Sequence, residues 1–298
     1  MKVGIDIGGS HIAIGLVNNN GEILKKIEKD IEQQENMETD IVNYVDNAIS
    51  ELVKIDNIDY IGIAAPGNPK NSKIYNIVNL KIDELDFSFI EEKYKIKIKS
   101  INDAKAAGLA EKKYGSLKDY NDAVFLCLGT GIGGAVFLDN KLLIANKNPG
   151  FELGHMVIDR KGDRCNCGKK GCFETYCSMK RWKEKVVNEL NEIEKDIKIE
   201  DGSNIVELLK KHSDNEKLQE LVDEYINNLI VGLSNIIDIF EPEIIALGGS
   251  FVYFKDILYD KLLDEMNKRM YVFNKEDLPK IELAKFKNDA GIIGATLI

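Results

Sequence analysis

Residues 3–17 read VGIDIGGSHIAIGLV, two apolar runs separated by a Gly-Gly-Ser turn. The alternation of residues predicts two strands, Val3–Ile7 and Ile12–Val17. A polar turn that ends in Asn20-Gly21 comes next, and Ile23–Ile27 is predicted as a third strand, because Asn-Gly between apolar runs favours a hairpin. This part of the chain is therefore expected to form three strands joined by tight turns.

The same pattern recurs in residues 123–144. A strand at Ala123–Leu128 leads into the glycine turn GTGIGG, and strands at Ala135–Leu138 and Leu142–Ile144 follow. After each copy, apolar residues at helical spacing alternate with short apolar runs. Two copies of one plan predict an α/β fold with duplicated βββαβα halves, mixed sheets and helices outside.

Three helices can be predicted from periodicity and end signals. They are expected at about residues 103–114, at Leu218–Phe240 and at about residues 289–297. The first of them ends at Gly115. Gly115-Ser116 is the best candidate for a domain boundary, because the second glycine-turn hairpin begins soon afterwards.

The 298 residues include 40 lysines and arginines against 50 aspartates and glutamates, a net charge of −10. This acidic balance argues against contact with a phosphate backbone, so no nucleic-acid partner is expected. The sequence has neither a signal-peptide core nor a run of about 18 apolar residues, so we expect no membrane association and a cytoplasmic protein.

One histidine and three cysteines lie close together as His155, Cys165, Cys167 and Cys172. One imidazole and three thiolates suit a tetrahedral structural zinc site. A disulfide or a set of free thiols is the alternative. Zinc is favoured, because a cytosolic chain keeps its thiols reduced and a chain of this length needs no disulfides for stability.

Glu152 and Glu174 lie at the two ends of this cysteine-rich segment. A metal that ties down the loop would also fix these carboxylates in a polar ligand pocket. The alternative is that both are solvated surface residues. Cys127 and Cys177 are predicted to be buried and not to be ligands.

Two glycine turns that directly follow apolar strands are candidates for phosphate binding. They are Asp6-Ile-Gly-Gly-Ser10 and Gly129-Thr130-Gly131. Such turns present backbone N–H groups and a hydroxyl to phosphate oxygens, although hairpin turns of this kind are common without a ligand. Neither is followed by Gly-Lys-Ser/Thr, which excludes a P-loop.

Asn102-Asp103 lies where a predicted strand ends and a helix begins. Both residue types cap helices well, which is one explanation. The other is a general base, because a carboxylate at a helix N-terminus is stabilised as an anion and can accept a proton from a hydroxyl. Gly67 and Asn79 lie in turns after strands, where they either bind a hydroxyl-rich ligand or only form the turn.

Together these motifs resemble the ROK family of sugar kinases and related repressors. The resemblance rests on Asp6–Ser10, Asn102–Ala104, LGTGIGG at 128–134, Glu152-Leu-Gly-His155 and the cysteine-rich segment ending at Glu174. It implies an actin-like, ribonuclease-H-like fold of two lobes, with ATP and a hexose in the cleft between them. The implied lobes are residues 1–117, on which a helix at about 286–298 packs back, and residues 118–285 with the zinc loop.

The resemblance also implies a role for each matching residue. Asp103 would take the proton from the sugar 6-hydroxyl as it attacks the γ-phosphate of ATP. Asp6 would orient Mg²⁺ through water, and the zinc would be structural. The sugar would be contacted by Asp103 together with Gly67, Asn79, Asn102, Glu152, His155 and Glu174. Phosphates would be bound by Gly9, Ser10, Thr130 and Gly131. The adenosine would lie near Gly249.

One position departs from the family pattern. Ser10-His11 stands where the family usually has Thr-Lys. Serine keeps the hydroxyl, but His11 does not supply a constant positive charge. A phosphate contact from a lysine at this position is therefore not expected.

The leading hypothesis is an ATP-dependent kinase that phosphorylates the 6-hydroxyl of glucose. N-acetylmannosamine or N-acetylglucosamine is the alternative substrate, and a non-catalytic sugar sensor is the alternative of another class. A transcriptional repressor is not expected, because the first strand starts at Lys2 and leaves no room for a DNA-binding module. The resemblance implies a homodimer or homotetramer.

Overall fold

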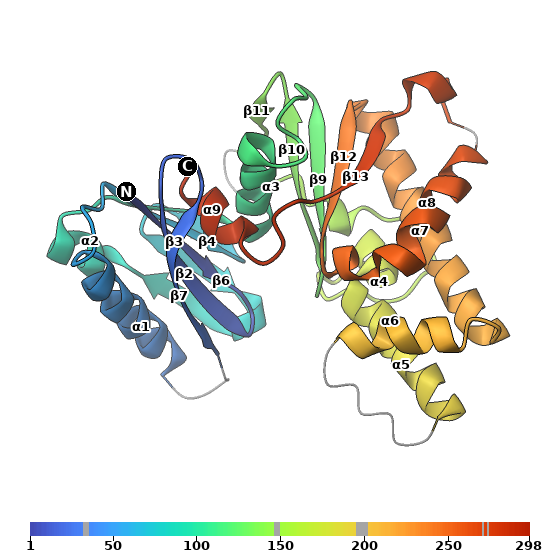
Figure 1. Cartoon of the computed structure of the whole chain (residues 1–298), viewed down its shortest axis with the longest axis horizontal. Helices are drawn as coiled ribbons and strands as arrows, with labels where there is room; N and C mark the ends of the chain where they lie inside the picture. The colour runs from blue at the N-terminus through green and yellow to red at the C-terminus, as the bar shows by residue number, and fades with distance from the viewer. Residues whose placement is uncertain (32–35, 146–149, 195–201, 270, 273) are drawn as a thin grey trace. The chain divides into compact units, whose positions relative to one another are not determined.

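The structure is a computed structural model that describes residues 1–298, except 32–35, 146–149, 195–201, 270 and 273 and the side chains of 79, 202 and 203. The chain forms two compact units, which Figure 1 colours along the sequence. Unit 1 consists of Met1–Asp119, Leu142–Phe151 and Asn288–Ile298. Unit 2 consists of Tyr120–Lys141 and Glu152–Lys287.

Unit 1 is built on a five-stranded mixed sheet with the strand order β3-β2-β1-β4-β8. The first three strands are antiparallel, as expected for strands joined by tight turns, whereas β4 runs parallel to β1 and β8 runs parallel to β4. The bounds are β1 Lys2–Ile7, β2 His11–Val17, β3 Ile23–Asp30, β4 Tyr60–Ala65 and β8 Ile98–Asn102.

Helix α1 (Met37–Leu52) covers one face of this sheet. Its buried residues recur at helical spacing, and they pack with Val3, Ile5 and Ile7 of β1 in one apolar core. Because side chains alternate along a strand, the residues between them, such as Gly4, face the opposite side. The two faces of the sheet are therefore covered by different helices.

Helices α3 (Asp103–Tyr114) and α9 (Ala290–Ala295) pack on the opposite face and against each other. Two glycines allow this close approach. A Cβ at Gly62 would lie 1.7 Å from the carbonyl oxygen of Ala295, and a Cβ at Gly294 would lie 1.7 Å from that of Ala106. The last residues of the chain thus complete the unit that its first residues begin.

A second, three-stranded antiparallel sheet belongs to unit 1. It has the order β5-β6-β7 and is followed by helix α2 (Ser88–Tyr94). The hydroxyl of Ser100 on β8 donates to the carbonyl of Asn71 at 2.7 Å, which joins this sheet to the edge of the larger one. The bounds are β5 Asn68–Lys70, β6 Lys73–Ile77 and β7 Ile82–Asp86, with a 3-10 turn at Val78–Leu80.

Unit 2 repeats the larger sheet, with the strand order β11-β10-β9-β12-β13. β9 and β10 are antiparallel, and β12 is parallel to both β9 and β13. The matching order confirms the predicted duplication in a mixed α/β fold. The bounds are β9 Ala123–Leu128, β10 Ile132–Leu138, β11 Lys141–Leu142, β12 Ile244–Gly249 and β13 Lys280–Leu283.

The prediction of a strand at residues 142–144 is wrong in its bounds. β11 ends at Leu142, because the chain leaves the sheet there and joins unit 1. The predicted helices at 218–240 and 289–297 are confirmed, with α7 at Glu216–Phe240 and a shorter α9. Asn215 begins α7 by accepting a hydrogen bond from the Leu218 N–H at 3.0 Å.

Unit 2 is rich in helices, and α7 lies at their centre, in contact with α4, α5 and α8. Trp182 of α5 is buried against Tyr225 and Phe254, with ring centroids 5.3 and 5.2 Å away. Among the described residues, no helix combines the length and apolar character needed to cross a membrane. The other bounds are α4 Phe173–Cys177, α5 Met179–Ile193, α6 Gly202–Lys211 and α8 Lys255–Asn267, with 3-10 turns at Leu153–His155, Ser250–Phe254 and Lys275–Asp277.

Candidate functional site

Asp6 is the penultimate residue of β1 and lies just before the first glycine turn. Protein surrounds its carboxyl group, although part of the residue remains accessible. Burial, followed by the negative charge of Asp103, raises the pKa of Asp6 from 3.8 to about 7, against the opposing charge of Lys26. Asp103 is thus close enough to Asp6 to affect its ionisation.

The first glycine turn is closed by its own backbone. The Gly8 N–H donates to the carbonyl of His11 at 2.8 Å, and Gly9 and Ser10 are exposed at the tip. The imidazole of His11 lies 3.2 Å from a carboxylate oxygen of Asp30 on β3. The side chain of His11 is therefore directed to a carboxylate on the neighbouring strand.

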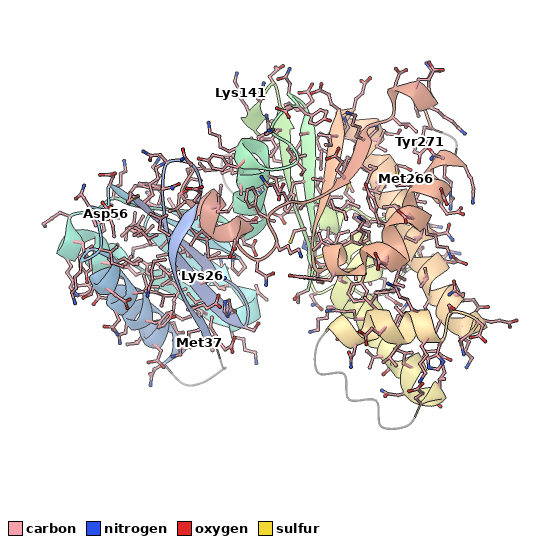
Figure 2. The ribbon with its side chains drawn as sticks, in the orientation of Figure 1. Lys26, Met37, Asp56, Lys141, Met266 and Tyr271 are labelled. Carbon is pink, nitrogen blue, oxygen red and sulfur yellow. The ribbon has the colours of Figure 1, made fainter. Side chains whose placement is uncertain are left out.

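Lys26, labelled in Figure 2, is a charged residue on β3 that sequence reasoning missed. Its charge acts on Asp6. Its ammonium lies 2.7 Å from Glu28 and 3.0 Å from Asp289, the residue before α9. In the strand register Lys26 lies opposite Gly15, which has no side chain to obstruct it. Glu28 is two residues away on the same strand, but Asp6 and Asp289 are distant in the chain, so no local sequence signal could have placed Lys26 beside them.

Asn102 and Asp103 lie at the junction of β8 and α3. The side chain of Asn102 caps the helix by accepting a hydrogen bond from the Lys105 N–H at 3.3 Å. This leaves the amide NH₂ of Asn102 as a donor that the cap does not use. Asp103 accepts a hydrogen bond from the Ala104 N–H at 2.8 Å, so its carboxylate is held at the helix N-terminus.

Lys105 is a second residue that the sequence did not reveal. It is only 3% exposed, and its ammonium donates to the carbonyl of Gly150 at 2.8 Å. Gly150 and Phe151 both have left-handed backbone conformations, with φ of 65° and 53°. Phenylalanine adopts such a φ only where surrounding contacts enforce it. The hydrogen bond from Lys105 to Gly150 thus stabilises the backbone just before Glu152.

Gly67 lies in the turn after β4 with φ of 87°. A Cβ there would meet the carbonyl oxygen of Tyr75 at 2.6 Å, so the turn requires glycine for a structural reason. Asn79 lies in the 3-10 turn after β6, and its side chain is outside the part of the chain that the structure describes.

In unit 2, the second glycine turn is held by Glu174. Glu174, in the first turn of α4, accepts a hydrogen bond from the Ile132 N–H at 2.8 Å. A Cβ at Gly131 would lie only 2.4 Å from the same carboxylate oxygen. Gly249, at the end of β12, pairs with Leu128 just before the turn. Glu174, Gly249 and the turn containing Thr130 thus lie together.

The histidine and three cysteines singled out from the sequence come together in unit 2. One ligand atom from each of His155, Cys165, Cys167 and Cys172 lies within 4.8 Å of the others. The Cys167 and Cys172 sulfurs are 3.6 Å apart, and the Cys165 sulfur is 3.7 Å from Nδ1 of His155. Tetrahedral zinc with bonds of about 2.3 Å to sulfur requires separations of about 3.6–3.8 Å.

No disulfide joins the cysteines of this cluster in the structure, where the Cys167 and Cys172 sulfurs are 3.6 Å apart. Burial and the neighbouring sulfurs raise the pKa of Cys172 to about 12. Three adjacent thiolates repel one another, so a bound cation is what allows them to ionise together. The donor set and its spacing therefore fit a zinc ion.

Glu152 immediately precedes the 3-10 turn that contains His155. Its carbonyl accepts a hydrogen bond from the His155 N–H at 3.0 Å, and its side chain is exposed. The ammonium of Lys169, within the cysteine-rich loop, donates to the carbonyl of His155 at 2.8 Å. The backbone around His155 is therefore fixed by contacts within unit 2.

The candidate residues divide between the two units as follows. Unit 1 contains Asp6, Gly9, Ser10, Gly67, Asn79, Asn102 and Asp103, and unit 2 contains Thr130, Gly131, Glu152, His155, Glu174 and Gly249 together with the three cysteines of the metal cluster. Within unit 1, charge couples Asp6 to Asp103. Within unit 2, hydrogen bonding couples Glu174 to the second glycine turn.

Comparison with known proteins gives a match along nearly the whole chain. The sequence model of the ROK family matches residues 2–298. A glucokinase of Thermotoga maritima is 30% identical, over 99% of this chain and 96% of that protein. A xylose repressor of Caldicellulosiruptor bescii is 27% identical, over 98% of this chain and 76% of the repressor.

Solved structures agree on the fold. A ROK family glucokinase from Streptomyces griseus, in complex with glucose and AMPPNP, superposes with a TM-score of 0.80. The two sequences are 22% identical, and the match covers 99% of this chain and 97% of that one. The actin-like fold expected from the sequence motifs is therefore confirmed.

Proposed function

This chain belongs to the ROK family, and from that premise we propose that it is an ATP-dependent kinase that phosphorylates the 6-hydroxyl of a hexose. The observation that carries the proposal is the position of Asp103. Its carboxylate lies at the N-terminus of α3, and its charge contributes to the raised pKa of Asp6. A fixed anion beside a second carboxyl group suits both proton transfer and metal binding.

In the proposed reaction Asp103 accepts the proton of the 6-hydroxyl while that oxygen forms a bond to the γ-phosphorus of ATP. The bond from the γ-phosphorus to the bridging oxygen breaks, and ADP leaves. Mg²⁺, held through water by Asp6, would neutralise phosphate charge. The protein contributes mainly by positioning and by electrostatic stabilisation.

Phosphate and nucleotide binding is assigned to the two glycine turns. Exposed Gly9 and Ser10 offer backbone N–H groups and a hydroxyl, and Thr130 and Gly131 offer the same groups in the turn held by Glu174. Gly249, beside the second turn, would lie next to the adenosine.

Sugar binding is assigned to the remaining candidates. The free amide donor of Asn102 suits a sugar hydroxyl, because its oxygen is already used in the helix cap. The other proposed sugar contacts are Gly67, Asn79, Asp103, Glu152, His155 and Glu174. The carboxylate of Glu174 would then bind the sugar in addition to accepting its hydrogen bond from the Ile132 N–H.

We assign a structural Zn²⁺ to His155, Cys165, Cys167 and Cys172. The gathering of the four donor atoms within 4.8 Å of one another supports this assignment, and two of the separations, at 3.6 and 3.7 Å, match those in tetrahedral zinc sites. Zinc would hold the loop in place and supply no chemistry. With Nδ1 of His155 facing Cys165, Nε2 of the ring would be left for a sugar hydroxyl.

The direct test is ADP release from MgATP with a panel of hexoses and N-acetylhexosamines. Asp103→Asn is expected to reduce kcat by at least about a thousandfold while sugar binding survives, because the general base is lost but the shape is kept. Asp83→Asn, which alters an exposed carboxylate on β7, is the matched control. A near-normal kcat in Asp103→Asn would refute the assignment of the base.

Glucose is our first choice of substrate, and N-acetylmannosamine or N-acetylglucosamine is the alternative. The complete Glu152-Leu-Gly-His155 motif favours glucose. Turnover confined to one member of the panel would decide between them. A homodimer or homotetramer in the cytoplasm remains our prediction for the working protein.

A non-catalytic sugar sensor is the second candidate function. The similarity to xylose repressors favours it, because those proteins are relatives over nearly all of this chain. Asp6 and Asp103 argue for catalysis, since a sensor needs neither a metal-orienting carboxylate nor a base. Tight binding of one sugar with no ADP release on any sugar would favour the sensor.

A further inference from the structure

A cavity of about 950 Å³ lies entirely within unit 1, beside the edge strand β8. It is lined by the β5–β6 hairpin, by β8 and α3, by residues 142–145 and by residues 297–298. Sites for drug-sized ligands measure about 300–1,000 Å³, so this cavity has room for more than one simple hexose.

The charged side chains that line this cavity are all positive. Its described residues include Lys70, Lys99 and Lys105 and no aspartate or glutamate, in a chain whose net charge is −10. Lys70 lies directly opposite Lys73 in the hairpin register, an arrangement of like charges that costs stability. Lys73 has its own carboxylate partners in Glu84 and Asp86, at 2.7 and 2.8 Å. Lys70 therefore adds a positive charge to the lining, and the ion pairs of Lys73 with Glu84 and Asp86 do not involve it.

The other two lysines are more enclosed. Lys105 is buried, and Lys99 is half-buried with its ammonium 6.0 Å from the centre of the Tyr60 ring. Charges acting from a partly desolvated wall attract an anion more strongly than charges in open water. Asn68, Asn76, Ser100 and Asn102 add amide and hydroxyl donors to the same wall.

The remaining wall is apolar. Leu109, Leu142 and Ile144 line it together with residues 297–298, and Ile144 is 63% exposed. A ligand that covered Ile144 would gain from burying this side chain. The cavity thus suits a molecule with both an anionic group and an aliphatic part.

We propose that this cavity binds a carboxylate-bearing substituent of the sugar substrate, so that the preferred substrate class is acidic hexose derivatives. The inference rests on the proposed function, because Asn102 both lines the cavity and is assigned to a sugar hydroxyl. Lys70 and Lys99 hold the carboxylate, and the aliphatic part of the substituent packs on Leu109 and Ile144.

The test compares N-acetylmuramic acid with N-acetylglucosamine, which differ by one lactyl ether that carries a carboxylate and a methyl group. Binding is measured by calorimetry without nucleotide, and ADP release is measured with MgATP. The acidic sugar is expected to bind about tenfold tighter or more, as hydrogen bonds between charged groups allow. The double variant Lys70→Gln/Lys99→Gln should lose this preference, whereas Lys54→Gln, an exposed lysine on the same unit, should keep it.

Two results would overturn the inference. One is equal affinity for the two sugars, and the other is a loss of preference in Lys54→Gln as large as in the double variant. If a neutral hexose is nevertheless phosphorylated, the proposed kinase function stands without the inference. Preferential binding of the acidic sugar with no ADP release on any sugar would support the cavity and contradict the kinase.

Discussion

Asp6 shows how its surroundings determine the charge of a single residue. Its pKa is raised to about 7 chiefly by burial and then by Asp103, although Lys26 opposes the shift. A Mg²⁺ ion near Asp6 would favour the ionised form, so the empty and the metal-bound protein would differ in their proton content at neutral pH. Metal binding and proton release should therefore be linked at this residue.

The raised pKa of Asp6 predicts a pH dependence of stability. Between about pH 4 and 7 the folded protein keeps a proton that the unfolded chain releases, so this residue's contribution to stability is lost as the pH rises. In metal-free protein, Asp6→Asn should raise the free energy of unfolding at pH 8 by on the order of 2–4 kcal/mol and have little effect near pH 4. Denaturant titrations across this range provide the measurement.

Asp83→Asn, which removes an exposed carboxylate, is the control for these titrations. It should change stability little at any pH. An Asp6→Asn variant whose stability followed that of the unmodified protein from pH 4 to 8 would contradict the raised pKa.

At the scale of single residues, the sequence predicted what local motifs encode. The glycine turns and the Asn102-Asp103 junction follow from neighbouring residues, and the structure places them at strand ends. Lys26 and Lys105 were not predictable, since their partners Asp289 and Gly150 are far away in the chain. A lysine in a sequence gives no sign of the distant oxygen that it will contact.

Among the elements, the cysteine-rich loop offers the clearest test. Cys167→Ser should reduce bound zinc, lower the free energy of unfolding by at least about 2 kcal/mol and weaken sugar binding, because the loop fixes His155 and its neighbour Glu152. Metal analysis, thermal unfolding and calorimetry with the preferred sugar measure these effects. Removing zinc with a chelator should reproduce them.

Cys127→Ser is the matched control for this experiment, because Cys127 lies on β9 and is not one of the four clustered residues. It should leave the zinc content unchanged. Unaltered sugar affinity in protein verified to be metal-free would show that the loop does not support sugar binding.

Elements with strong periodicity were predicted well, and short elements were not. The paired hairpins and α7 have long alternating or helical patterns, and all of them form. The β5-β6-β7 sheet was missed because β5 reads Asn-Pro-Lys and β7 reads Ile-Asp-Glu-Leu-Asp, which resemble loops. Such strands form through pairing with β6, which a local pattern does not reveal.

For the whole molecule, the division into units predicts where a truncation will act. Removing residues 288–298 deletes α9 and uncovers the sheet face that contains Gly62, so unit 1 should lose its cooperative structure. Hydrogen exchange of β1 and β4 should become fast. Unit 2 should unfold as before, which the fluorescence of Trp182, the protein's single tryptophan, reports.

The full-length chain is the reference for this comparison, and both probes are recorded on the same samples. Protection of β1 and β4 that survived the truncation would show that α9 is dispensable to unit 1. If the truncation lowered the stability reported by Trp182 fluorescence as much as the stability reported by hydrogen exchange in β1 and β4, the two units would not unfold independently.

The late position of α9 in the chain also has a consequence during synthesis on the ribosome. Domains usually fold in the order in which they emerge, the N-terminal one first. Here α3 covers only part of one face of the sheet made first, and the part over β1 and β2 stays uncovered until residues 290–295 leave the exit tunnel. Unit 2 needs nothing beyond Lys287. The nascent chain should therefore complete its second unit before its first, and its early strands should depend longest on chaperones.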